Sequence, residues 1–360
     1  MFHAVGKMKL RNGHMLPREG VERILVRGTN WIGDAVMTLP ALSAIRKTYP
    51  EARISVLVKP WVADIYQLCP HVDEVILYER PGIHDGKGGI FRLVRELKAR
   101  NFHLAVCLQN AIEAAIITRL AGIPLRAGYN SDGRGFLLTH AVRRTGAIKK
   151  VHQADYYLAM TRALGCADAE GGPYLRLRPE DDGPVEELLL NYGLKAARLL
   201  VGFAPGAHYG PAKKWFPERF AVLADRLKDE FQAQIILFGS DADRETTKTI
   251  QQAAGRPLID LAGRTNLRTA VALIARCGLF VSNDSGLMHV AGALDIPTIA
   301  VFGSTNPITT APLGEKSVII YKGAACSPCL KETCPADFRC MEMIETDEVI
   351  GTARDLLCQG

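Results

Sequence analysis

Short apolar runs alternate with amphipathic segments along the first half of the chain. The runs are long enough for buried strands, and the segments between them carry apolar residues at helical spacing. Residues 35–48, for example, place Val36, Leu39, Leu42 and Ile45 on one helical face. This alternation is typical of a parallel, doubly wound α/β sheet. It predicts strands at 24–27, 53–58, 74–78, 104–107 and 126–129, and helices at 35–48, 61–68, 91–100, 111–120 and 149–164.

The same alternation restarts after a polar stretch rich in glycine and proline around residues 170–184. It predicts strands at 199–204, 234–238, 258–260, 279–282, 297–302 and 317–321, and helices at 185–192, 217–230, 244–254, 267–277, 287–294 and 346–357. We therefore expect two Rossmann-like domains, 21–178 and 179–345, with parallel sheets that face a central cleft. Residues 1–20 are expected to be a disordered leader, and the closing helix, in 346–360, to pack back on the first domain.

Length and composition support a two-domain protein of ordinary globular type. The chain has 360 residues, of which 48% are hydrophobic and 23% charged, and one core seldom serves more than about 250 to 300 residues. The formal net charge of +6 is compatible with an acidic partner but does not indicate a nucleic-acid binder. We expect neither a signal peptide nor a membrane-spanning helix. Most of the cysteines are scattered, which favours a reducing compartment.

The strongest site signal is the turn between the predicted strand 279–282 and helix 287–294. Asn283-Asp284-Ser285-Gly286 would cap that helix and present a carboxylate, a hydroxyl and free backbone N–H groups, with His289 one turn further on. Helix N-termini at the carboxyl edge of a parallel sheet bind anionic ligands. We therefore expect an anion site at this turn.

A second turn, residues 204–217, follows another strand of the same predicted sheet. It is rich in glycine and proline and ends in Lys213 and Lys214 before Trp215. Small residues let a ligand approach the backbone, and a lysine supplies a point charge for phosphate. The turn is either part of the anion site or a solvated basic loop anchored by Trp215.

The turn after the first strand, Gly28 to Asp34, has the length of a phosphate loop but not its chemistry. Asp34 and Ala35 stand where such a loop carries lysine and serine or threonine, and the dinucleotide Gly-x-Gly-x-x-Gly spacing is missing. This disfavours a dehydrogenase. Asp34 is either a general base at the head of a helix or a residue that caps the helix and complements its dipole.

One acidic residue and one pair of arginines could each either bind a ligand or serve a structural role. Asp243, in Asp241-Ala-Asp243, opens a helix after a strand, where a carboxylate binds a ribose or adenine amine or caps the helix. We expect no metal there. Arg126 and Arg134 belong to a basic part of the first domain that is either a solvated face or a grip for an anionic acceptor.

Four cysteines lie close together near the end of the chain, as Cys326-x2-Cys329-x4-Cys334-x5-Cys340. They could close a tetrahedral site for a structural zinc ion, remain free thiols or form disulfides. Their spacing matches no common zinc-ribbon or iron–sulfur pattern.

Several of these stretches together resemble glycosyltransferase family 9. The resemblance covers about residues 22–357 and keeps the same order of motifs in both halves. Its most specific strings are Asn283-Asp-Ser-Gly-Leu-Met-His289 and Pro211-Ala-Lys-Lys-Trp215. The others are residues 24–34 with 39–42, 119–129, 204–207 and 238–240. The leader before Val21 is longer than the family usually has, and the four-cysteine cluster is found in only some of its members.

The resemblance implies a two-domain GT-B fold and an inverting heptosyltransferase that requires no cofactor for catalysis. The donor would be ADP-L-glycero-D-manno-heptose, bound by the C-terminal domain. The acceptor would be the heptosyl-Kdo2-lipid A inner core of lipopolysaccharide, received by the N-terminal domain at the cytoplasmic face of the inner membrane. A non-catalytic nucleotide or sugar binder of the same fold, or a member with another donor or acceptor, is the alternative.

The resemblance also assigns roles by motif. Asp34 would be the general base, and Lys213 would contact the donor diphosphate. Asn30, Trp31, Arg126 and Arg134 are candidate acceptor contacts. The donor loop would comprise Asp284, Ser285, Gly286, Leu287 and His289, with Asp243 and Thr265 beside the adenosine.

Overall fold

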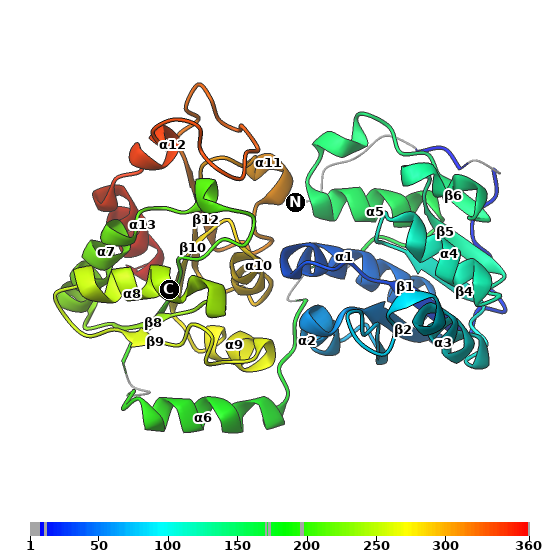
Figure 1. Cartoon of the computed structure of the whole chain (residues 1–360), viewed down its shortest axis with the longest axis horizontal. Coiled ribbons are helices and arrows are strands. Elements are labelled where there is room, and N and C mark those ends of the chain that lie inside the picture. Colours follow the sequence, from blue (N-terminus) through cyan, green and yellow to red (C-terminus); the bar gives the residue numbers. More distant parts are fainter. Residues whose placement is uncertain (1–7, 11–12, 170, 172–173, 195–197, 359–360) are drawn as a thin grey trace. The chain divides into compact units, whose positions relative to one another are not determined.

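The chain folds into two compact units, residues 1–176 and 177–360, in a computed structural model that describes residues 8–10, 13–169, 171, 174–194 and 198–358. Each unit is built around one six-stranded sheet (Figure 1). All the strand pairs within both sheets are parallel. This confirms the expected α/β class with two Rossmann-like halves.

The sheet of unit 1 has the strand order β3-β2-β1-β4-β5-β6. Its strands agree with the predicted ones to within one residue at each end, because each is a short apolar run between helices. The exception is β6, whose three residues are too few to form a recognisable run. The strands are β1 (Arg23–Arg27), β2 (Arg53–Val58), β3 (Glu74–Leu77), β4 (Leu104–Cys107), β5 (Leu125–Tyr129) and β6 (His140–Val142).

The helices of unit 1 lie between these strands and cover the sheet. Helix α1 continues through Pro40 although proline lacks an amide donor, because α1 is buried and packs along α5. Helix α5 starts later than predicted, since the ring of His152 caps it by accepting from the amide of Ala154 at 3.1 Å. The helices are α1 (Ile32–Thr48), α2 (Ala63–Gln67), α3 (Gly86–Ala99), α4 (Ile112–Leu120) and α5 (Gln153–Ala163).

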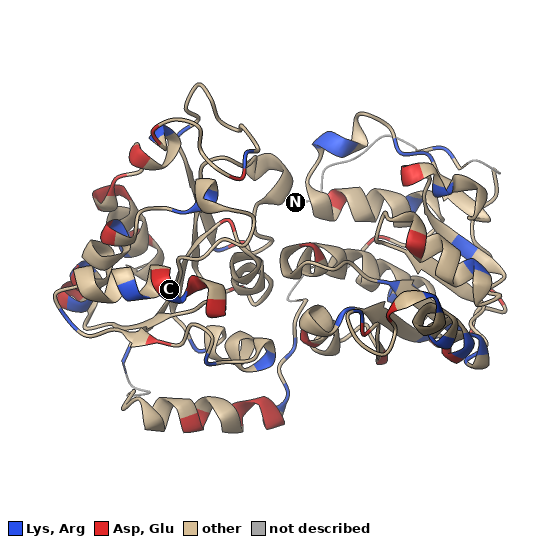
Figure 2. Ribbon diagram, viewed as in Figure 1, with Lys and Arg blue, Asp and Glu red and all other residues tan. Residues whose placement is uncertain are grey.

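The sheet of unit 2 has the order β12-β11-β10-β7-β8-β9. Strands β10 and β11 lie inside it, are buried throughout and carry no charged residue, as Figure 2 also shows. Near-continuous apolar runs of this kind are what a parallel sheet covered on both faces requires. The strands are β7 (Leu200–Ala204), β8 (Gln234–Leu237), β9 (Ile259–Asp260), β10 (Leu279–Asn283), β11 (Thr298–Phe302) and β12 (Ser317–Tyr321).

The core of unit 2 is organised around Trp215, which is fully buried and packs edge-on against Phe220. Its indole Nε1 donates to the carbonyl of Ile344 at 2.9 Å, so the ring is buried without an unpaired donor. The helices are α6 (Asp182–Asn191), α7 (Pro217–Phe231), α8 (Arg244–Ala253), α9 (Leu267–Ile274), α10 (Gly286–Ala293), α11 (Pro307–Thr310), α12 (Arg339–Glu342) and α13 (Thr346–Cys358).

The closing helix, α13, packs inside unit 2. It lies against α7 (Figure 1), and Val349, Ile350 and Ala353 belong to the same core as Trp215 and Phe220. The apolar face of this helix is therefore buried within unit 2, and packing on the first domain stays a prediction. The amphipathic pattern predicts that a helix has a buried face but does not identify the surface that buries it.

The described part of the leader, residues 8–10 and 13–20, makes contacts with the rest of unit 1. Leu10 forms an antiparallel bridge with Val142. Leu16 is buried, and its amide donates to the carbonyl of Leu164 at 3.0 Å. The remainder of the leader lies outside the described residues. Within the described residues, the helices include none with the length and apolar character needed to span a membrane.

Replacing Ile350 by alanine tests the packing of α13. Ile350 is 1% exposed, and truncating such a side chain costs about 2 to 4 kcal/mol. We expect the free energy of unfolding of unit 2 to fall by that amount in urea, followed by the fluorescence of the buried Trp215. Leu190→Ala on α6, where the side chain is 79% exposed, is the control and should change the free energy by less than about 0.5 kcal/mol. An unchanged Ile350→Ala protein would contradict this packing.

Candidate active site

The ends of three neighbouring strands of unit 2 place an ion pair at the carboxyl edge of its sheet. Lys213 ends the short 3-10 turn η5 (Pro211–Lys213) after β7, and Asp284 follows β10. The ammonium Nζ of Lys213 lies 2.6 Å from Oδ2 of Asp284, and the hydroxyl of Thr305, after β11, donates to the same oxygen at 2.7 Å. Lys213 and Asp284, two predicted site residues that are 71 residues apart in the chain, are therefore in direct contact.

This ion pair is largely shielded from water. The side chain of Asp284 is 5% exposed and that of Lys213 is 15% exposed. A buried carboxylate is tolerated only when a cation and hydrogen-bond donors compensate for its lost hydration. Lys213 and Thr305 do so here.

Asn283 ties the two turns together. Its Oδ1 accepts from the amide of Trp215 at 3.0 Å, and its Nδ2 donates to the carbonyl of Pro205 at 2.7 Å. Asn283 is fully buried, so both ends of the lysine turn are fixed to the end of β10. The position of Lys213 thus depends on a side chain next to its own ion-pair partner.

Helix α10 begins directly after Asp284 with Ser285 as its N-cap. The hydroxyl of Ser285 lies 3.0 Å from that of Ser282 and makes no capping bond to the helix. Gly286 and Leu287 form the first turn, whose amides have no partner within the helix. His289 is 3% exposed in the next turn. The residues predicted to form the donor loop therefore lie together in the turn after β10 and in the first two turns of α10.

Asp243 ends the 3-10 turn η6 (Asp241–Asp243) and makes the contacts of a helix cap. Its Oδ2 accepts from the amide of Ser240 at 2.9 Å and from its hydroxyl at 2.8 Å, and Nζ of Lys214 lies 3.9 Å from Oδ1. A Cβ on Gly206 would collide with this carboxylate. Asp243 therefore caps the start of this helix, and its contact with a nucleoside stays a prediction. Thr265 lies half-buried in the loop after β9.

In unit 1, the turn before α1 is fixed by a buried arginine. The guanidinium of Arg27 donates to the carbonyl oxygens of Gly28 and Leu57, at 2.6 and 3.1 Å, and to Oδ1 of Asn30 at 3.0 Å. Burial lowers the pKa of this guanidinium. A Cβ on Gly28 would lie 2.6 Å from Val58, so the turn can approach β2 only through a glycine.

Tyr66 and Trp61 hold the other side of this turn. The amide of Thr29 donates to the phenol oxygen of Tyr66 at 3.1 Å, and Thr38 on α1 lies 3.1 Å from the same oxygen. The indole of Trp61 donates to the carbonyl of Asn30 at 2.7 Å. The turn is thus a rigid platform at the start of α1.

Asp34 stands in the first turn of α1, three residues after the N-cap residue Trp31. Its carboxylate complements the helix dipole there, but it is not the cap. Burial raises the pKa of the Tyr157 phenol on α5 well above its usual value, and the nearby charge of Asp34 adds to that rise. Asp34 is half-buried and Trp31 is 58% exposed, so both are presented at the head of α1.

The two arginines predicted as acceptor contacts both donate to backbone carbonyls of unit 1. Arg134 is fully buried, and its guanidinium donates to the carbonyl oxygens of Tyr129, Gln109 and Cys107. Arg126 donates to the carbonyl of Leu137 at 2.8 Å and to two others in its own loop. Arg134 therefore braces the interior of unit 1 and Arg126 braces its own loop, while their contact with an acceptor stays a prediction. A sequence shows that an arginine is charged, but it does not show whether the side chain contacts a ligand or donates to backbone carbonyls elsewhere in the fold.

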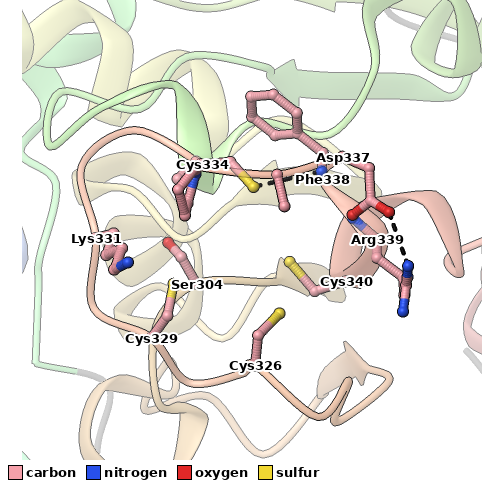
Figure 3. A pocket seen from close by; sticks show the side chains of 12 residues that line it. Ser304, Cys326, Cys329, Lys331, Cys334, Asp337, Phe338, Arg339 and Cys340 are labelled. Atoms are coloured by element: carbon pink, nitrogen blue, oxygen red, sulfur yellow. Dashed lines mark hydrogen bonds and ion pairs between the residues drawn. The ribbon is translucent and has the colours of Figure 1, made fainter.

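The four clustered cysteines line one small pocket of about 80 Å³ in unit 2 (Figure 3). All are free thiols, and burial raises the pKa of Cys340, with the neighbouring cysteines adding to the rise. Among the residues that the structure describes, no three histidine, cysteine or carboxylate side chains converge as a metal site. Of the alternatives for Cys326, Cys329, Cys334 and Cys340, the structure therefore gives no support to a structural zinc ion.

Two residues of the candidate site were missed by the sequence reasoning. Thr305 follows β11 as Asp284 follows β10, so the convergence of parallel strand ends could have suggested it. Tyr209 carries Nζ of Lys213 over its ring, 5.1 Å from the centroid. Its hydroxyl donates to the carbonyl of Leu330, 121 residues away, and no local pattern marks such a contact.

Comparisons with known proteins agree over both units. The family model described as glycosyltransferase family 9 (heptosyltransferase) matches residues 90–338. Lipopolysaccharide heptosyltransferase 2 of Escherichia coli (strain K12) is 35% identical over 311 residues, covering 83% of this chain and 87% of that protein. Lipooligosaccharide heptosyltransferase 2 of Haemophilus influenzae is 32% identical over 315 residues, with 82% and 88% covered. The solved structure of E. coli ADP-heptose LPS heptosyltransferase II has a TM-score of 0.78 at 30% identity, over 94% of this chain and 99% of that one.

The ion pair predicts a stability effect that can be separated from activity. Lys213→Met would leave the buried Asp284 carboxylate with the Thr305 hydroxyl but no cation, which costs about 3 kcal/mol for a buried pair. We expect a loss of that order in urea unfolding of unit 2. Adding Asp284→Asn removes the uncompensated charge and should recover most of the loss. Equal stability of Lys213→Met and wild type would show that the pair contributes nothing to the fold.

Proposed function

The chain belongs to glycosyltransferase family 9, and on that basis we propose that it is an inverting heptosyltransferase of lipopolysaccharide inner-core synthesis. It would move L-glycero-D-manno-heptose from ADP-heptose to a heptosylated Kdo2-lipid A acceptor. The observation that carries this proposal is the Lys213–Asp284 ion pair beside the start of α10, in a chain whose similarity to heptosyltransferase 2 proteins extends over both units.

In this proposal the second domain, residues 179–345, binds the donor. The diphosphate would lie between the ammonium of Lys213 and the first amides of α10, at Ser285, Gly286 and Leu287. A helix N-terminus and a lysine are a common pair for phosphate, since one offers directed donors and the other a mobile charge. Asp284 would then hold Lys213 in place and accept hydrogen bonds from the heptose hydroxyls. His289, one turn further along α10, would complete the donor loop.

The adenosine would lie toward Asp243 and Thr265. The carboxylate of Asp243 is occupied by its cap contacts to Ser240, so its remaining oxygen is the one available to a ribose hydroxyl. This oxygen is packed against the backbone at Gly206, where a Cβ would lie 2.3 Å from it, and it is 3.9 Å from Nζ of Lys214. The Asp243 carboxylate is therefore the group proposed to bind the ribose.

The first domain, residues 21–178, would receive the acceptor, and Asp34 would be the general base. Its carboxylate takes a proton from the acceptor hydroxyl as that oxygen attacks the anomeric carbon from the face opposite ADP. One displacement inverts the configuration, and ADP leaves with an added negative charge. Lys213 and the amides at the start of α10 stabilise that charge, so the displacement requires no cofactor.

Asn30 and Trp31 remain proposed acceptor contacts. The turn that carries them is fixed by Arg27, Tyr66 and Trp61, and Trp31 is exposed. A rigid turn with an exposed indole suits the stacking of a sugar ring beside the base. Because the acceptor is anchored to a lipid, we place the enzyme at the cytoplasmic face of the inner membrane.

The proposal is tested by assaying the purified full chain with ADP-, GDP- and UDP-sugars and with inner-core acceptors that carry no heptose or one. We expect release of ADP from ADP-heptose only when the heptosylated acceptor is present. Tight binding of ADP-heptose without transfer to any acceptor would instead identify a nucleotide-sugar binder. Turnover with another nucleotide sugar would move the chain to a different donor within the family.

Replacing Asp34 by asparagine tests the base. The amide keeps the size of the side chain but cannot take a proton, and general-base catalysis is typically worth about a hundredfold to ten-thousandfold in rate. We expect kcat to fall within that range while the Kd for ADP-heptose, measured by calorimetry, stays within about twofold of wild type. Glu51→Gln, an exposed carboxylate between α1 and β2 of the same unit, is the control for loss of a carboxylate. Normal turnover of Asp34→Asn would remove Asp34 as the base.

A further inference from the structure

The turn that carries Lys213 is held by a segment that the reaction itself does not use. Residues 324–340 contain the four clustered cysteines and run beside this turn. The carbonyl of Glu332 accepts from the amide of Ala212 at 3.1 Å, directly before the lysine. A side chain on Gly210 would collide with that carbonyl. The backbone of the turn and that of the segment are therefore paired at close range.

Tyr209 makes the second contact between the turn and the segment. Its hydroxyl donates to the carbonyl of Leu330 at 2.8 Å, while its ring lies under Nζ of Lys213, 5.1 Å away. Tyr209 is 45% exposed, so packing alone does not fix its rotamer. The hydrogen bond to Leu330 fixes the ring, and the ring attracts the ammonium through its negative face.

Leu330 is itself held in an unusual conformation. Its φ of 56° lies in the left-handed region, which is unfavourable for a residue with a side chain. Its amide donates to the carbonyl of Ser304 at 2.8 Å, and its own carbonyl accepts from Tyr209. Ser304 directly precedes Thr305, the second donor to Asp284. The backbone of Leu330 therefore connects the two partners of the ion pair. Its carbonyl holds Tyr209, which contacts Lys213, and its amide holds Ser304, which precedes the Asp284 partner Thr305.

The cysteine pocket lies between the same two anchor points. Its lining includes Ala212 and Ser304 together with the four thiols, and Figure 3 shows Ser304, Cys326, Cys329 and Cys340 arranged around it. The hydroxyl of Ser327 also donates to the carbonyl of Gly303. The packing of these side chains thus determines how closely the segment approaches the turn that carries Lys213.

We propose that Tyr209 is a positioning residue for Lys213 and that the four-cysteine segment, residues 324–340, is the support that holds Tyr209 in place. This inference rests on the proposed role of Lys213 at the donor diphosphate. A lysine side chain has several freely rotating bonds, and fixing it before the ligand arrives lowers the entropy lost on binding. The segment would therefore act on donor affinity more than on the chemical step.

The first test compares Tyr209→Phe with two matched variants. Tyr209→Phe keeps the ring but loses one hydrogen bond, which predicts a rise of about threefold to tenfold in KM for ADP-heptose and in the Kd for ADP, with kcat changed less than twofold. Tyr49→Phe, which loses a phenol bond of 3.0 Å to a carbonyl in unit 1, should leave both constants unchanged. Leu330→Gly keeps the backbone bonds and relieves the left-handed conformation, so it should also match wild type. A Tyr209→Phe enzyme with unchanged KM, or with a loss confined to kcat, overturns the proposal.

The second test asks whether the cysteines act through Tyr209. Cys329→Ala removes a half-buried thiol from the pocket and should raise KM for ADP-heptose severalfold, whereas Cys358→Ala, an exposed thiol on α13, should not. In the double variant Cys329→Ala with Tyr209→Phe, KM should rise no further than in the more affected single variant. A rise equal to the product of the two single effects would show independent sites and overturn the supporting role of the segment.

A third measurement needs no substrate and separates this inference from the proposed function. Amide exchange at Ala212 reports its bond to Glu332, and we expect faster exchange in Tyr209→Phe than in wild type or Tyr49→Phe. If wild type transfers no heptose but Ala212 still responds, the proposed function fails and the support of the turn stands. If transfer occurs but the exchange of Ala212 is the same in all three proteins, the support proposed here is wrong.

Discussion

The ion pair between Lys213 and Asp284 is the interaction on which the candidate site depends. Each partner is shielded from water, so neither charge is tolerated without the other. Their contact also joins the end of β7 to the end of β10, two strands that are neighbours in the sheet. The same carboxylate that would orient a sugar therefore stabilises the turn that would bind its diphosphate.

Both units use a buried polar side chain to shape a turn at the carboxyl edge of a sheet. In unit 2 the amide group of Asn283 bonds to the backbone at both ends of the lysine turn. In unit 1 the guanidinium of Arg27 bonds to backbone carbonyls beside the turn that leads to Asp34. These bonds fix the backbone of each turn to the strand ends beside it. Rigid turns of this kind can present a base or a phosphate contact without reorganisation during the reaction.

The sequence predicted much of this architecture because the relevant signals are local. Buried parallel strands must be short apolar runs, and the helices between them must be amphipathic, so every strand except β6 was placed within a residue or two. The turns that carry Asp34, Lys213 and Asp284 were found for a related reason, since the carboxyl ends of parallel strands share one edge. The family motifs then assigned chemistry to those turns.

What only the tertiary structure decided was the partner of each side chain. The sequence determined that Arg134 is charged, that the last helix is amphipathic and that four cysteines are clustered. It could not determine that Arg134 bonds to buried carbonyls, that α13 packs on α7, or that the cysteine segment meets the lysine turn at Tyr209. These contacts join residues far apart in the chain, and their geometry follows from how whole elements pack, whereas a local pattern specifies only an element and its buried face.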